Sequence, residues 1–323
     1  MAAPIGTAAT AQTTANADQQ GSAGHRDLRL FVFGLFFTFG GITSLNDVII
    51  PKLKSLFTLS YAEAMLVQSA FFAAYFIISL PAAEIVRRIG YMRTAALGLV
   101  TMTAGCLLFV PASASGLFGM FLVALFVLAA GITTVQVVAN PLISMLGNPA
   151  TAHSRLTFAQ AFNSLGTTIF PYVGSILILG SLAKVDQASL SGAALEAFRV
   201  AETQVVEHTY LGLAAALLAV AALVWRARKR LVETLADSTN IAEAFGLLTL
   251  PRFALGALCI FLYVGAEVSI GSVIVNYLMQ SSVMGLGAED AGKHVPYYWG
   301  GAMAGRFIGA YFLRVFSPGK VLA

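Results

Sequence analysis

Long apolar stretches separated by short polar segments make up most of the chain after residue 27. A helix rises about 1.5 Å per residue, so roughly 20 apolar residues cross the ~30 Å hydrocarbon layer of a bilayer. The pattern therefore predicts about eight transmembrane helices, near residues 28–50, 63–85, 94–111, 117–146, 156–180, 208–226, 253–279 and 295–316.

Composition supports a membrane protein. Hydrophobic residues make up 58% of the 323 positions and charged residues 11%, whereas a soluble domain carries roughly 25% charged residues. Too few charges remain to solvate a globule, so membrane lipid is the expected surroundings. The net charge of +4 comes from basic residues scattered at the edges of apolar runs, which argues against nucleic acid as a partner. The predicted fold class is an all-α membrane protein.

The predicted organisation has five parts. Residues 1–27 are rich in Ala, Thr, Gln and Ser and have no apolar run, which predicts a disordered tail. Residues 28–226 hold an N-terminal bundle of six helices. A cytoplasmic linker, 227–252, opens with a basic cluster, and 253–316 form a partial second bundle before a tail at 317–323.

The distribution of basic residues predicts the orientation. Because Lys and Arg accumulate on the cytoplasmic side of membrane proteins, we assigned 18 of the 19 to loops or helix ends on one side or the other. About thirteen fall on the side of the two termini, which predicts that both termini are cytoplasmic. One more, Arg306, lies inside a span, and the opposite side holds Lys52, Lys54, Lys184, Arg199 and Lys293.

Asp47 is the most costly polar residue in the predicted spans. It lies in the first span beside Asn46 and one turn after Thr43, and an ionised Asp at a helix centre costs about 2.5–3.5 kcal/mol on insertion scales. One interpretation is a carboxylate near the outer interface that reaches water. The functional interpretation is a proton carrier, because a partly buried carboxyl can exist neutral or charged.

Amide side chains recur in the fourth and fifth spans. Gln136 and Asn140 share one helix face, as do Gln160 and Asn163. Asn140 could instead satisfy carbonyls freed by Pro141, and interhelical hydrogen bonds are a competing role for all four. Amides both donate to and accept from hydroxyls, and the first six spans lack the central Lys or Arg that an anionic substrate would require. The pattern therefore favours a sugar.

Other features are less specific. Glu267 lies mid-span in the seventh span, where it could line a cavity or form a structural ion pair with Arg306. The chain has no phosphate-binding loop, hydrolase triad or paired metal-binding carboxylates, so we predict no enzyme activity, no cofactor and no metal. Aromatic residues that could face the C–H side of a pyranose are Phe36, Phe39, Phe71, Phe72 and Tyr75.

Several short strings together resemble the fucose/galactose/glucose:proton symporters of the major facilitator superfamily, over about residues 30–316. The strings are Ser44-Leu45-Asn46-Asp47, Gln68-Ser69-Ala70-Phe71, Tyr75-Phe76-Ile77-Ile78, Ala139-Asn140-Pro141, Ala159-Gln160 and Phe162-Asn163-Ser164-Leu165-Gly166. Bacterial glucose/galactose transporters also share Tyr263-Val264-Gly265-Ala266-Glu267. The resemblance implies a fold of two six-helix bundles, of which this chain would hold the first bundle and about two helices of the second.

The resemblance also implies roles. In the fucose branch an acidic residue of the first helix serves proton coupling, and it corresponds to Asp47. A second acidic residue, in the fourth helix, corresponds to Gln136, so the chain departs from that branch and is nearer the glucose/galactose transporters. We therefore expect a hexose:proton symporter of a bacterial inner membrane, with Asp47 as proton site and sugar contacts at Asn46, Gln136, Asn140, Gln160, Asn163 and Glu267.

Four alternatives stay open at this stage. The coupling ion could be sodium, which a carboxylate with neighbouring oxygens also binds, and the sugar could be L-fucose. The protein could be a membrane sensor that does not transport. Because the resemblance implies about four further helices, the chain could also be a truncated, inactive transporter. The sequence predicts no oligomeric state.

Overall fold

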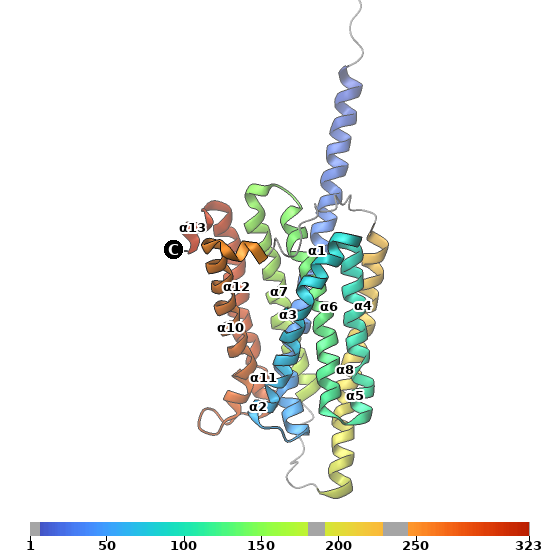
Figure 1. The fold of residues 1–323 in the computed structure, drawn as a ribbon, viewed down its shortest axis with the longest axis vertical. Coiled ribbons are helices and arrows are strands. Elements are labelled where there is room, and N and C mark those ends of the chain that lie inside the picture. Colours follow the sequence, from blue (N-terminus) through green and yellow to red (C-terminus); the bar gives the residue numbers. More distant parts are fainter. Residues whose placement is uncertain (1–6, 180–190, 229–244, 323) are drawn as a thin grey trace, which may run out of the picture.

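The computed structural model describes residues 7–179, 191–228 and 245–322, and its regular structure in these ranges is helical (Figure 1). This confirms the predicted all-α membrane fold. Seven helical segments are long and apolar enough to cross a membrane. Helix α12 is not one of these seven, although it has 21 residues. The long helices are α1 Thr7–Leu56, α3 Leu66–Ile89, α4 Tyr91–Leu107, α6 Phe118–Met145, α7 Ala152–Gly174, α8 Gly192–Ala227, α10 Pro251–Met279 and α12 Val295–Val315.

Short elements complete or connect these helices. The spans that include α4 and α7 extend to Ser115 and Leu179 through α5 and the π-helical turn η2. Helix α2 begins with a capping box between Ser60 and Glu63, which satisfies exposed N–H groups at the helix start. The short elements are α2 Tyr61–Ala64, α5 Phe109–Ser115, α11 Ala288–Gly292, α13 Pro318–Leu322, η1 Pro149–Thr151, η2 Ser175–Leu179 and η5 Leu247–Thr249.

Helix boundaries differ from the sequence-based prediction mainly at the ends. Helix α1 begins at Thr7, within the segment predicted as a disordered tail, and its Ala and Gln residues are good helix formers. Helix α8 begins at Gly192, well before the predicted start at residue 208. The predicted linker 227–252 lies partly outside the described residues, and the predicted tail after residue 316 contains α13.

The first six long helices form a bundle with one continuous apolar core, which includes Phe36, Phe71, Phe109 and Tyr210. Small residues let its helices approach closely. A Cβ atom added to Gly166 of α7 would collide with the backbone carbonyl of Phe37 in α1. Without a hydrophobic driving force between helices in lipid, such close van der Waals contact is a main source of their association.

Helices α10 and α12 lie beside this bundle, drawn in orange and red in Figure 1. Helix α12 packs along α7, where the Phe307 ring meets Phe158 at a centroid distance of 5.7 Å and the Ser154 hydroxyl donates to the Ala310 carbonyl at 2.9 Å. Helix α10 contacts α1 and α12. This packing turns one face of α10 and α12 toward α1 and α7.

The structure corrects the predicted position of Lys52. Sequence analysis assigned it to an outer loop, but α1 continues through Pro51 to Leu56 and buries Lys52 completely. Its ammonium group forms an ion pair with Glu202 of α8, whose side chain is only 7% exposed. A buried charge requires such a partner, so Lys52 is not one of the loop cations that indicate orientation.

Candidate functional site

A cavity of about 490 Å³ lies between α1, α3, α6, α7, α10 and α12. This volume is within the range typical of small-molecule sites. The structure brings six of the seven predicted site residues to its wall: Asp47, Gln136, Asn140, Gln160, Asn163 and Glu267. Asn46 is the exception. Neighbouring residues of a helix point in different directions, so Asn46 and Asp47 do not share a face.

Asp47 lines this cavity and is 4% exposed. Gln68 of α3 donates one hydrogen bond to the Asp47 Oδ1 atom at 3.2 Å and another to the Ser272 hydroxyl of α10. Asn46 donates to the Gln68 Oε1 atom at 3.5 Å. Gln68 thus joins the carboxyl of α1 to a helix of the second half, and Asn46 acts through Gln68 without lining the cavity.

Two further residues of the second half surround the carboxyl. A Cβ atom added to Gly271 would lie 3.4 Å from the Asp47 Oδ2 atom and 2.8 Å from the Trp299 ring, so glycine at this position allows both groups to approach α10. Within the described ranges, no Lys or Arg forms an ion pair with Asp47. The carboxyl therefore has hydrogen-bond donors around it but no fixed positive charge.

The predicted amides line the cavity from α6 and α7. Gln136 donates to the Tyr75 hydroxyl at 3.2 Å, and Gln160 donates to the Asn140 Oδ1 atom at 3.4 Å. Asn163 donates to the Phe36 backbone carbonyl at 3.4 Å. An amide offers up to four hydrogen-bonding positions, so each retains capacity for a solute in the cavity. The Asn140 side chain thus accepts its hydrogen bond from another amide, that of Gln160.

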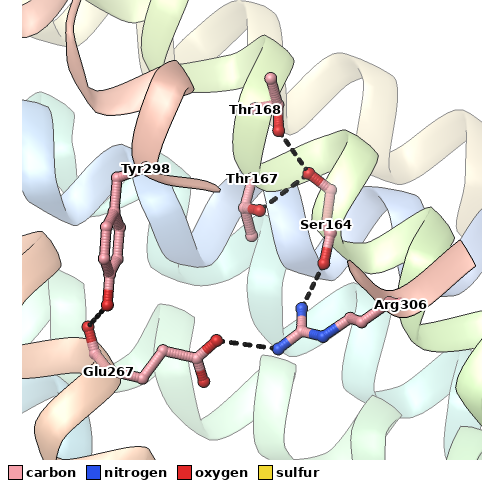
Figure 2. A network of polar contacts seen from close by, with 6 residues as sticks. All are labelled: Ser164, Thr167, Thr168, Glu267, Tyr298 and Arg306. Carbon is pink, nitrogen blue, oxygen red and sulfur yellow. Dashed lines mark hydrogen bonds and ion pairs between the residues drawn. The ribbon is translucent and has the colours of Figure 1, made fainter. Parts of the chain in front are cut away.

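Glu267 fulfils both roles that its position suggested. It lines the cavity, and its Oε1 atom accepts from the Arg306 Nη2 atom at 2.9 Å. Figure 2 shows that Arg306 also donates to the Ser164 hydroxyl of α7, while the Tyr298 hydroxyl donates to the Glu267 backbone carbonyl at 3.0 Å. Arg306 therefore connects α10 and α12 to the first bundle.

Several lining residues were not among the predicted site residues: Gln68, Thr157, Thr167, Tyr263, Trp299 and Arg306. Helical spacing could have found Thr157, because it lies one turn before Gln160. Thr167 falls on the same polar stripe of the fifth span as Gln160 and Asn163. Of the predicted aromatic residues, Phe39, Phe72 and Tyr75 line the cavity, whereas Phe36 and Phe71 are in the core. No group of three or more potential metal ligands occurs in the part of the chain that the structure describes.

Comparison with known proteins agrees with this geometry. The profile of the Major Facilitator Superfamily matches residues 31–323. A glucose/galactose transporter of Brucella abortus biovar 1 is 46% identical over 289 residues, which cover 90% of this chain and 67% of that protein. The L-fucose-proton symporter of Escherichia coli K12 is 31% identical over 297 residues, which cover 90% and 68%. The chain thus spans about two thirds of the length of these relatives.

A solved structure of the Escherichia coli fucose:proton symporter has the same fold, with a TM-score of 0.75 and 28% identity over 93% of this chain and 74% of that one. The superfamily consists of membrane transport proteins, so the prediction of a multi-pass membrane transporter and not an enzyme is confirmed. Profile, relatives and fold agree with the sequence motifs, and the chain belongs to the Major Facilitator Superfamily.

Proposed function

We propose that this protein imports a hexose, glucose or galactose, by proton symport across a bacterial inner membrane. One observation carries the proposal: a single cavity holds the Asp47 carboxyl, which has no ion-pair partner among the described residues, together with amides from separate helices. Amides suit a neutral, polyhydroxylated solute because they donate and accept at once. The names of the relatives, a glucose/galactose transporter and an L-fucose-proton symporter, support the same class of solute.

In this proposal Asp47 takes up the proton and the amides of Gln136, Asn140, Gln160 and Asn163 hold the sugar, with Glu267 as a further acceptor. Protonation removes the negative charge that Gln68 stabilises by its hydrogen bond to Asp47. Because Gln68 also contacts Ser272 of α10, a change at Asp47 alters a contact between the two halves. Movement of one half against the other around a central site is how such transporters expose it to either side.

Coupling one proton to one sugar is energetically sufficient. One elementary charge that crosses 100 mV releases about 2.3 kcal/mol. Since each tenfold concentration ratio corresponds to about 1.4 kcal/mol, one proton supports roughly fortyfold accumulation of an uncharged hexose. The excess of basic residues on the side of both termini supports a cytoplasmic location for those termini.

The test uses the full-length protein in proteoliposomes with an imposed inward proton gradient and no sodium. We expect the wild type to accumulate labelled glucose or galactose. Asp47→Asn should retain exchange of labelled for unlabelled hexose but lose accumulation, because it can bind sugar and cannot release a proton. Asp290→Asn, an exposed carboxylate outside the cavity, serves as the matched control and should accumulate normally.

The same preparation separates the alternatives. Accumulation driven only by a sodium gradient would identify sodium, and not the proton, as the coupling ion. Stronger competition by L-fucose than by glucose or galactose would identify L-fucose as the substrate. Normal accumulation by Asp47→Asn would remove Asp47 from the coupling step. No exchange of any sugar by a folded wild type would favour a sensor and contradict transport.

A further inference from the structure

Acidic side chains outnumber basic ones around the cavity. Three charged side chains line it within the described residues: Asp47, Glu267 and Arg306. Arg306 is thus the cation of this wall, and it comes from α12, outside the first six spans that sequence analysis searched for a central positive charge. With Asp47 ionised the lining carries one net negative charge, and with Asp47 protonated it is neutral.

Arg306 is engaged on two sides. One terminal nitrogen donates to Glu267 at 2.9 Å and the other donates to Ser164 (Figure 2). The side chains of Glu267 and Arg306 are 14% and 22% exposed, so the pair borders the cavity and is not sealed in a core. Tyr263, one turn before Glu267, lines the same wall.

We propose that Glu267 is a specificity residue that masks the charge of Arg306 and restricts the cavity to uncharged sugars. The solutes it would exclude are hexuronates, which have the ring of a hexose with a carboxylate in place of the C6 hydroxymethyl group. This inference rests on the proposed hexose transport and names what that site rejects.

The reasoning follows from the hydrogen-bond geometry of arginine. A sugar carboxylate is best bound by two parallel N–H groups of a guanidinium, and in this structure Glu267 already takes one terminal nitrogen of Arg306. An arriving anion would also meet the carboxylates of Glu267 and Asp47 in the same cavity. A neutral hexose meets neither obstacle, and Glu267 can accept a hydrogen bond from one of its hydroxyl groups. The ion pair therefore selects neutral sugars by weakening the binding of anionic ones, and it does not raise the affinity for neutral sugars.

A gain of function tests this inference. Proteoliposomes with the full-length protein exchange labelled hexose in the presence of unlabelled glucuronate or galacturonate. We expect no inhibition of the wild type by either hexuronate. Glu267→Gln leaves Arg306 without its carboxylate, and hexuronate should then inhibit hexose exchange at a concentration at least tenfold below the highest one that leaves the wild type unaffected. The double variant Glu267→Gln/Arg306→Gln removes the cation and should lose this inhibition again.

Controls separate a filter from a structural ion pair. Glu267→Asp keeps the charge and should still exclude hexuronates. Glu289→Gln breaks a partly exposed ion pair with Lys293 outside the cavity and should behave as wild type. Glu267→Ser removes the same charge with a smaller side chain and serves if the Gln variant does not fold. A purely structural role predicts lower yield of folded protein and no new sensitivity to hexuronate.

Two results would overturn the inference: inhibition of the wild type by hexuronate, or hexose exchange by the single variants Glu267→Gln and Glu267→Ser that is as insensitive to hexuronate as that of the wild type. Failure of the proposed function is a separate outcome. In that case the wild type itself would exchange no hexose, whereas failure of the charge filter leaves hexose exchange intact.

Discussion

The buried ion pair between Lys52 and Glu202 predicts a large and asymmetric effect on stability. It joins α1 to α8, and the two side chains are 0% and 7% exposed. Glu202→Gln removes one charge and leaves the ammonium group buried without its carboxylate. Loss of one partner of a buried pair typically costs about 3–5 kcal/mol, whereas replacing both partners by apolar residues is often neutral. We therefore expect Lys52→Met/Glu202→Leu to be more stable than Glu202→Gln.

The assay uses the two cysteines. Cys106 is buried and Cys259 is exposed, so in a Cys259→Ser background a thiol-reactive dye reports unfolding through Cys106. Glu289→Gln at the partly exposed pair with Lys293 is the control, because pairs near the surface contribute at most about 1 kcal/mol. The reasoning would be refuted if Glu202→Gln were as stable as the wild type, or if the double variant were no more stable than Glu202→Gln.

Two further changes concern the cavity wall. Tyr75→Phe removes the hydroxyl that accepts from Gln136 at 3.2 Å; the loss of one hydrogen bond, about 0.5–1.5 kcal/mol, should raise the KM for hexose about two- to tenfold, and an unchanged KM in transport assays would contradict this role. Gly40→Ala places a methyl group about 2.5 Å from the Asn163 amide, so we expect weaker hexose exchange and a loss of about 1–3 kcal/mol in thermal unfolding. Gly34→Ala on the same helix has no atom within 4 Å of the added methyl group and is the matched control, because it gives the same gain in helix propensity without a collision. An equal loss in both variants would show that the collision with Asn163 is not responsible.

The cavity was partly predictable because membrane helices restrict where polar side chains can lie. In lipid, a Gln or Asn within a span must face another helix or a cavity, and residues four apart share one face. This is why Gln136, Asn140, Gln160 and Asn163 could be selected from sequence. The same reasoning could not separate Asn46 from Asp47, because adjacent polar residues both satisfy the rule and only the packing of α3 decides which faces the cavity.

The partners across the cavity were beyond sequence reasoning. Gln68 and Ser272 are 204 positions apart, and Arg306 and Ser164 are 142 apart. No periodicity within one helix contains information on such a pairing, because it depends on the angle and depth at which two helices pack. Lys52 illustrates the consequence: next to Pro51 it resembles a loop residue, and its partner Glu202 lies 150 positions away.

Hydrophobic length and helical period are local properties of the chain. They were therefore enough to predict a helical membrane protein, the positions of most of its long helices, and the polar side chains that are too costly to face lipid. Contacts between distant helices arise only when the helices pack. For this reason the structure was needed to show which of those side chains share one cavity, that Gln68 links Asp47 to the second half, and that Glu267 forms an ion pair with Arg306.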